Sequence, residues 1–247
     1  MIRMPKFSST VQHRMLINYR VDPVVARSLV PAGMRPQIVD GSAVAGICHI
    51  RQNRLRPAWL KVPVGLAAES SAHRIAVEWD DATGTHTGVY IAERHSSSRL
   101  AQLLGGRLVP GVQKRARFRS STGGDLIHLE LDSPATKVTA DVELTDEFHS
   151  ELWGDDLHAA SEFFRCGSVG WSPSHEGTLE ALQIDTDGWK VVPATALNVE
   201  SSYFDARPAG SAVLDCVLVL RDVPFGWSVP ATARREVVAP AATVAAR

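Results

Sequence analysis

The stretch Leu126-Ile127-His128-Leu129-Glu130-Leu131 alternates apolar and polar residues from Ile127 to Leu131, so one of its faces is more apolar than the other. This period of two predicts a half-buried β-strand. Eight more runs, rich in β-branched residues and bounded by turn residues, predict further strands: Val11–Tyr19, Ser42–Ile50, His73–Trp79, His86–Ile91, Lys137–Leu144, Leu179–Ile184, Ala196–Tyr203 and Val213–Arg221. Three segments have the composition of tight hairpin turns: Asp81–Gly84, Thr122–Asp125 and Asp185–Gly188.

Three short helices are predicted between these strands, each from a capping residue at its start and a Pro or Gly at its end. They are Val24–Val30 after Asp22 and Pro23, Arg99–Leu104 before Gly105-Gly106, and the segment from Asp155 or Asp156 to Arg165 before Gly167. Helices this few and short cannot supply the regular crossovers that a parallel sheet requires.

We therefore predict an α+β fold that is mainly β, an antiparallel closed or partly closed barrel with a few short helices on its rim. Residues 1–229 are expected to form this single β-rich barrel domain. The Ala/Pro-rich residues 230–247 show no hydrophobic period and are expected to form a disordered tail.

Composition and charge narrow the functional classes. A formal net charge of −1 gives no long-range field that would attract nucleic acid or an anionic membrane. Residues 1–20 lack the apolar core of a signal peptide, and the apolar stretch near Val217–Leu220 is too short to span a bilayer. The three cysteines lie among apolar or small residues, as buried thiols do in a reducing compartment: Cys48, Cys166 and Cys216. These features predict a cytoplasmic protein.

Metal, hydrolase and nucleotide sites are not predicted. None of the nine histidines forms a close-spaced pair, and Cys48 and His49 are neighbours on a predicted strand, so their side chains point to opposite faces. There is no G-x-S-x-G elbow, and Leu104-Gly105-Gly106 closes a helix rather than opening one. We expect no metal and no cofactor.

The segment Pro110–Arg119 contains Lys114, one of only five lysines in the chain. On a regular strand, Lys114 would share a face with Ala116 and Phe118, while three arginines would occupy the opposite, solvated face: Arg115, Arg117 and Arg119. A lysine beside a methyl and a phenyl group either packs its stem and extends its amine to water, or lies buried and reactive.

Several short motifs, in this order, resemble the acetoacetate decarboxylase superfamily, and an uncharacterised branch of it more than the decarboxylases themselves. They are Tyr19-Arg20-Val21-Asp22 before a short helix, Glu69-Ser70 ahead of a strand, and Gly111-Val112-Gln113-Lys114-Arg115. The resemblance covers about residues 10–228. It implies that Lys114 is a Schiff-base lysine and that Glu69 assists proton movement. It also implies that Arg20 binds a substrate carboxylate and that Arg115 stands at the place of a second lysine.

Three departures argue against acetoacetate as the substrate. Arg115 replaces a lysine, Gln113 replaces a proline, and the strand Ser42–Ile50 lacks a glutamate that the decarboxylases carry.

The leading hypothesis is a lyase of the acetoacetate decarboxylase-like type, with Schiff-base chemistry at Lys114 on a small keto acid or related carbonyl compound. Decarboxylation, aldol addition and dehydration are all compatible with that chemistry. In this hypothesis Glu69 is catalytic and Arg20 and Arg115 bind the substrate. Two alternatives stay open: a non-catalytic barrel that binds a small molecule with Lys114 as a charged anchor, and a cyclase or isomerase that uses Glu69 without an imine. The expected partner is a small molecule, with no nucleic acid and no membrane, and the usual preference for dimers allows a homo-oligomer.

Overall fold

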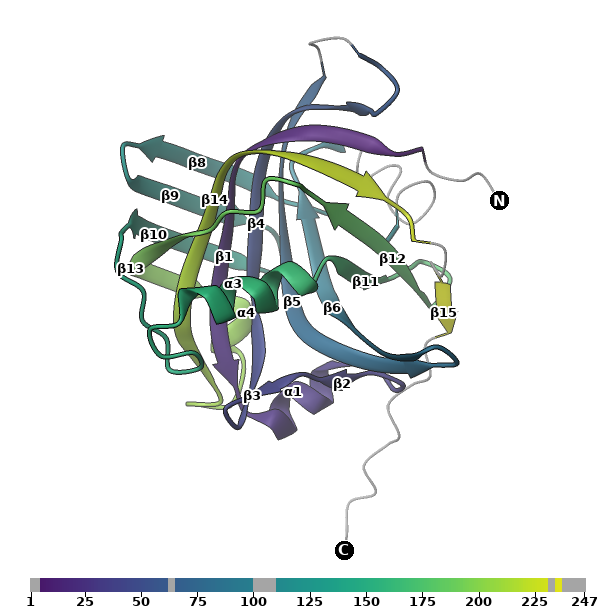
Figure 1. The fold of residues 1–247 in the computed structure, drawn as a ribbon, viewed down its shortest axis with the longest axis vertical. Coiled ribbons are helices and arrows are strands. Elements are labelled where there is room, and N and C mark those ends of the chain that lie inside the picture. Colours follow the sequence, from purple (N-terminus) through teal and green to yellow (C-terminus); the bar gives the residue numbers. More distant parts are fainter. Residues whose placement is uncertain (1–4, 62–64, 100–109, 231–233, 237–247) are drawn as a thin grey trace, which may run out of the picture.

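The computed structural model describes residues 5–61, 65–99, 110–230 and 234–236 (Figure 1). Its strands are β1 Phe7–Val21, β2 Arg35–Pro36, β3 Ile38–Val39, β4 Ser42–Pro57, β5 Leu66–Asp81, β6 Gly84–Ser96, β7 Lys114–Arg115, β8 Arg117–Gly123, β9 Leu126–Asp132, β10 Lys137–Leu144, β11 Val169–Pro173, β12 Thr178–Asp185, β13 Val192–Ser201, β14 Ala212–Ser228 and β15 Arg234–Glu236. The helices are α1 Pro23–Leu29, α3 Leu157–Cys166 and α4 Ser202–Asp205.

One continuous sheet contains all of these strands, in the order β15-β12-β11-β6-β5-β4-β1-β14-β13-β10-β9-β8 with β2, β3 and β7 at its sides. An additional pairing of β12 with β14 closes seven of them into a ring, β12-β11-β6-β5-β4-β1-β14. The pairings are antiparallel except for those of β6 with β7 and with β11. The predicted mainly β fold with few short helices is confirmed, with the strands arranged as this ring.

The strands beyond the ring form a second layer. β13, β10, β9 and β8 continue the sheet from β14 and are seen beside the ring in Figure 1. Hydrophobic side chains of β9 and β10, such as Leu129 and Ala140, share one buried cluster with Met15, Ile17 and Ile47 of the ring. The ring strands β1 and β4 therefore have one face covered by this second layer.

The opposite face of the same strands points into the ring. Leu16 of β1, Ile50 of β4 and Leu218 of β14 belong to a second buried cluster, which includes Ala160 and Phe164 of α3. Since side chains alternate along a strand, neighbouring residues on β1 and β4 enter different cores. The ring strands are buried on both faces, and most of their residues from 13 to 19 and from 43 to 50 are shielded from solvent.

The helix predictions for the described residues are confirmed, together with their caps. The carboxylate of Asp22 accepts hydrogen bonds from the backbone amides of Val24 and Val25 at the start of α1. Asp156 caps α3 by accepting from the amide of Ala159. The predicted helix Arg99–Leu104 lies outside the described residues, apart from Arg99.

Two local predictions were wrong. The turn Asp185–Gly188 does not close a hairpin, because β12 pairs with β11, β14 and β15 while β13 pairs with β10 and β14. The strand predicted to reach Tyr203 ends at Ser201 and gives way to α4. Long-range pairing decides both outcomes, and a local turn signal cannot report it.

The C-terminal segment contributes one described strand. Within the predicted tail, Arg234–Glu236 form β15 on the edge of β12, and the guanidinium of Arg235 lies over the rings of Trp79 and Trp171. Residues 231–233 and 237–247 lie outside the described residues. Within the described part of the chain, we find no helix with the length and apolarity needed to cross a bilayer.

Candidate functional site

A β-bulge in β6 sets the orientation of the side chains around the candidate site. Ile91 pairs with Arg74 of β5, whereas Glu93 pairs with His73, so Ala92 is an extra residue without an opposite partner. Ile91 and Glu93 would share a face on a regular strand. The bulge turns Glu93 towards the second layer and leaves Ile91 pointing into the ring.

Four buried histidines lie on the face of the ring that the second layer covers. His13, His49, His73 and His95 come from β1, β4, β5 and β6, and we call them the histidine row. The His13 and His49 rings are 5.4 Å apart, and those of His73 and His95 are 6.0 Å apart.

The histidine row is uncharged at neutral pH. Burial, with the nearby charge of Arg51, lowers the pKa of His13 to about 4, and burial with the charge of His95 lowers the pKa of His73 to about 4. Burial also lowers the pKa of His49 and of His95. Several of their ring nitrogens have no hydrogen-bond partner among the described residues, including both nitrogens of His49 and His73. These neutral nitrogens can bind a ligand or exchange protons with one.

Lys114 lies at one end of this row and contacts Glu93. β7 pairs in parallel with β6, which sets Lys114 opposite His95. The Lys114 Nζ donates to Glu93 Oε1 at 2.6 Å, and the side chain of Lys114 is 46% exposed. Lys114 is therefore not enclosed between Ala116 and Phe118. Its amine extends to a carboxylate at the edge of the site.

Glu93 is held as a carboxylate by its neighbours. The Thr136 hydroxyl donates to Oε2 while Lys114 donates to Oε1. Burial raises the pKa of Glu93, but the two hydrogen bonds and the charge of Lys114 outweigh burial, and the pKa is lowered overall. His95 Nε2 lies 3.8 Å from Oε2. Glu93 is ionised at neutral pH, and its Oε1 is in direct hydrogen-bond contact with the Lys114 amine.

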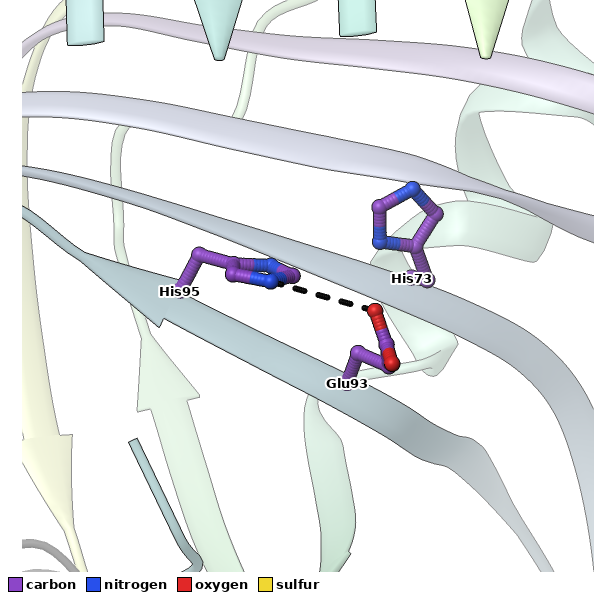
Figure 2. A group of neighbouring side chains, drawn as sticks. All are labelled: His73, Glu93 and His95. Atoms are coloured by element: carbon purple, nitrogen blue, oxygen red, sulfur yellow. Dashed lines mark ion pairs between the residues drawn. The ribbon is translucent and has the colours of Figure 1, made fainter. Parts of the chain in front are cut away.

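His73, Glu93 and His95 form the one group of ligand-type side chains among the described residues that could hold a metal ion, with their ligand atoms within 4.8 Å of one another (Figure 2). Two imidazoles and a carboxylate suit Zn²⁺ or Fe²⁺. Both oxygens of Glu93 already accept hydrogen bonds, one of them from the Lys114 ammonium. A cation bound to Oε1 would compete with the Lys114 ammonium, whereas Oε2 lies nearer to His95 and accepts a hydrogen bond only from Thr136. The expectation of a site without a metal stays a prediction.

Glu69 belongs to the same face but not to the Lys114 contact. Its Oε2 accepts from the Ser120 hydroxyl at 2.8 Å and lies 3.5 Å from His49 Nε2. The Arg51 guanidinium donates to the backbone and the hydroxyl of Ser120 beside it. Glu69 and Lys114 thus lie at different parts of the histidine row, with His49 nearest to Glu69 and Glu93 next to Lys114.

The two predicted substrate-binding arginines do not meet in this structure. Arg20 Nε lies 3.6 Å from the buried carboxylate of Asp215, which also accepts from Ser150. That ion pair joins β1 and β14 away from Lys114. Arg115 follows Lys114 in β7 and is exposed, as the alternation predicted, together with Arg117 and Arg119.

Sequence reasoning allowed Glu93-Arg94-His95 to line a pocket but gave Glu93 no role, and it did not single out Thr136. A signal for Glu93 was present, because Glu93-Arg94-His95 puts a carboxylate and an imidazole two residues apart on one strand. Thr136 lies between β9 and β10 and reaches Glu93 only through tertiary packing.

A partly open cavity lies inside the ring. Its volume is 490 Å³, and its lining comes from β1, β4, β5, β6, β12, β14 and α3. Four arginines line it, Arg14, Arg56, Arg74 and Arg94, and we call it the arginine cavity. Lys114 is not among its lining residues.

Residues 8–218 match the model of one protein family, DUF2071, which is described as an uncharacterized conserved protein. The chain belongs to this family. The match spans most of the ring and the second layer, including Lys114 and Glu93. No curated protein matches the chain.

Solved structures similar to this DUF2071 member are acetoacetate decarboxylase-like proteins. One is an acetoacetate decarboxylase-like enzyme from Sphingomonas wittichii RW1, with a TM-score of 0.61, 14% identity, and coverage of 96% of this chain and 95% of that one. Another is the acetoacetate decarboxylase of Legionella pneumophila subsp. pneumophila str. Philadelphia 1, with a TM-score of 0.59, 13% identity, and coverage of 94% and 87%. A third is the enduracididine biosynthesis enzyme MppR, complexed with the condensation product of pyruvate and imidazole 4-carboxaldehyde, with a TM-score of 0.58, 14% identity, and coverage of 95% and 90%. The resemblance to this superfamily is confirmed at the level of the fold.

Proposed function

We propose that this protein forms an imine between Lys114 and a small keto acid or related carbonyl compound, and that Glu93 carries protons in that reaction. The observation that carries the proposal is the 2.6 Å hydrogen bond from Lys114 Nζ to Glu93 Oε1 within an acetoacetate decarboxylase-like fold. Glu93 takes the catalytic carboxylate role that the sequence resemblance had given to Glu69, because Glu93 is the carboxylate in contact with the amine.

The chemistry begins with proton transfer from the Lys114 ammonium to Glu93. The neutral amine then attacks the carbonyl carbon, and the proton returns from Glu93 to the carbinolamine hydroxyl, which leaves as water. The resulting protonated imine accepts electrons from an adjacent bond. Loss of CO₂, addition to a second carbonyl compound and dehydration all follow from that electron sink.

The surroundings of Lys114 support this assignment. The neutral rings of His73 and His95 leave Lys114 and Glu93 as the charged pair at this end of the row. Arg115 is the exposed guanidinium next to Lys114 in the chain, and its role in binding a substrate carboxylate stays a prediction. The ion pair of Arg20 with Asp215 argues against a substrate-binding role for Arg20.

The names of the structural relatives indicate which probe to try first. MppR is described as complexed with pyruvate, and two further relatives are described as acetoacetate decarboxylases. Pyruvate and acetoacetate are therefore the first two compounds to test.

Reductive trapping tests the proposal. The full chain is incubated with pyruvate or acetoacetate and sodium borohydride, and its intact mass is measured. We expect one reduced adduct per chain on the wild type, none on Lys114→Ala, and an unchanged adduct on Lys137→Ala, since Lys137 is a surface lysine. Glu93→Gln should slow trapping by about tenfold or more. An adduct that survives Lys114→Ala, or no adduct with either compound, contradicts the proposal.

One observation favours the non-catalytic alternative. The Lys114 side chain is nearly half exposed and already neutralised by Glu93, as expected for a charged anchor at the mouth of a binding site. In that case borohydride traps nothing, yet calorimetry shows that the wild type binds the keto acid and that Lys114→Ala does not.

A further inference from the structure

The arginine cavity contains buried positive charge that the proposed reaction does not use. Arg14 and Arg74 are only 8% and 5% exposed, and Arg94 is partly buried. A buried guanidinium does not become neutral by losing its proton. Burial lowers the pKa of Arg74 only to about 10, so Arg74 stays charged at neutral pH.

These three guanidiniums lack an acidic partner. Among the described residues, no carboxylate lies within 4.0 Å of any of them. Their hydrogen bonds go to neutral atoms instead: Arg14 to Cys48 Sγ, Arg74 to Asn18 Oδ1, and Arg94 to Ser172 Oγ and the Gly170 carbonyl. The Nε of Arg74 is buried and has no hydrogen-bond partner in the described part of the chain.

Neighbouring aromatic rings offset part of the cost of these charges. Arg74 lies 4.9 Å above the ring of Phe164, and Arg14 lies 5.4 Å from Trp189 and 5.7 Å from Phe225. Cation–π contacts are weaker than the desolvation penalty of a buried charge. The charge of Arg14 also lowers the pKa of Arg74, so the two cations repel each other.

Most of the remaining cavity wall is apolar, with polar side chains such as Gln52 and Ser71 at a few places. Leu16, Ile50, Ile91 and Leu182 line it from four different strands, with Phe164 from α3 and Trp227 from β14. Its volume of 490 Å³ lies within the range of about 300–1,000 Å³ that is usual for small-molecule sites. Contact with such a wall gives no favourable free energy to a fully hydrated ion, but it does so for a hydrocarbon group that leaves water.

We propose that the arginine cavity binds an amphipathic anion, with a carboxylate or phosphate head on Arg14, Arg74 and Arg94 and an apolar body along the hydrophobic wall. An anionic head supplies the counter-charge that the described residues do not supply, and relieves the repulsion between Arg14 and Arg74. Guanidinium groups bind carboxylates and phosphates through paired N–H donors, and Arg74 has an unused Nε–H for such a contact.

This site is separate from the one in the proposed function. Arg74 and Arg94 are the direct chain neighbours of His73 and His95, and His95 also touches the cavity wall, but neither Lys114 nor Glu93 lines the cavity. The ligand would therefore contact neither Lys114 nor Glu93, and its binding does not depend on imine chemistry.

Binding of three ten-carbon compounds tests the proposal: decanoate, decyl phosphate and the uncharged decanol. Binding to the full chain is followed by tryptophan fluorescence, because Trp227 lines the cavity and Trp189 faces Arg14. We expect at least one of the two anions to bind, and decanol to bind about tenfold more weakly or worse, since it lacks the charged hydrogen bonds. The comparison of the two anions shows which head group the site accepts.

Variants connect the binding to the arginines. Arg14→Met and Arg94→Met should each raise the dissociation constant of the anion about tenfold or more and leave that of decanol unchanged. Arg119→Met, at an exposed arginine, is the matched control. Lys114→Ala should bind the anion like the wild type, even if it loses the imine, which separates this inference from the proposed function. Equal affinity for decanol and both anions, no binding of either anion, or unchanged anion affinity in both cavity variants overturns the proposal.

Discussion

The histidine row and the arginine cavity belong to the same strands, and burial affects their charges differently. The buried histidines are neutral at pH 7, whereas the buried arginines stay charged. His13 and Arg14 are neighbours on β1, His73 and Arg74 on β5, and His95 follows Arg94 on β6. Strand alternation turns these arginines into the ring and the neighbouring histidines towards the second layer, although His95 also touches the cavity wall.

The difference between the faces is a difference in proton affinity. A histidine ordinarily titrates near pH 6.5, so burial is enough to make it neutral at pH 7. An arginine titrates far above neutrality, and a lowered pKa of about 10 still leaves Arg74 charged. The histidine face can therefore stay dry and uncharged by itself, whereas the arginine face favours a ligand that brings negative charge.

The largest change in the free energy of unfolding should come from a substitution of Phe164, which lies between the arginine cavity and the core around α3. Phe164→Ala should lower the free energy of unfolding by about 3–5 kcal/mol, because it removes a fully packed ring and its contacts with Trp153 and Arg74. Urea unfolding measures the loss. Phe163→Ala, at the less buried neighbour, should cost clearly less, and equal losses would contradict this view of α3.

The histidine row should make the protein sensitive to acid. The folded pKa of His13 and of His73 is about 4, below the ordinary value near 6.5, so the unfolded chain takes up these protons first as the pH falls. Stability is then fully present above pH 6.5 and is lost between pH 6.5 and 4, by about 1.4 kcal/mol per pH unit for each histidine.

Urea unfolding at several pH values checks this prediction. His73→Gln should reduce the slope of stability against pH, while His175→Gln, at an exposed histidine, should leave it unchanged. The arginines should add nothing in this window, because they do not titrate there. A slope that is the same in wild type and His73→Gln would show that this histidine is not buried in neutral form.

A smaller effect of opposite sign is expected for Arg14. Replacement of its unpaired charge by an apolar chain of similar length in Arg14→Met should raise the free energy of unfolding by roughly 1 kcal/mol in the absence of ligand. His13→Met, one residue away on the other face, should not stabilise the protein. Thermal unfolding of both variants is the measurement, and a larger loss in Arg14→Met than in His13→Met would mean that Arg14 serves the fold rather than a ligand.

The smallest effect concerns Glu93. Thr136→Val keeps the shape of the side chain but removes one of the two hydrogen bonds that lower the pKa of Glu93. The pKa should rise by about one unit or less, and carbon NMR titration of the carboxyl group measures it. Ser133→Ala, which leaves both hydrogen bonds of Glu93 intact, should not produce that rise.

Most strands, two helix caps and the identity of Lys114 as the conspicuous lysine could be predicted because they rest on local patterns. Alternation in 126–131 and the Asp22-Pro23 start of α1 need only their own neighbours. The same is true of the exposed arginines after Lys114, which the structure confirms. The sequence left open whether Lys114 is buried or extends its amine outwards, and the structure shows the second: β7 is two residues long, and the amine reaches out to Glu93.

Local patterns in the sequence are enough to predict many half-buried strands, and histidine and arginine are neighbours on three of them. The face that each side chain enters, and the groups it meets there, follow from tertiary contacts. The extra residue Ala92 turns Glu93 to the face of Lys114, and the pairing of β12 with β14 encloses the arginines in a ring. Both depend on contacts between residues far apart in the chain, and a one-residue shift in register reverses every side chain that follows it.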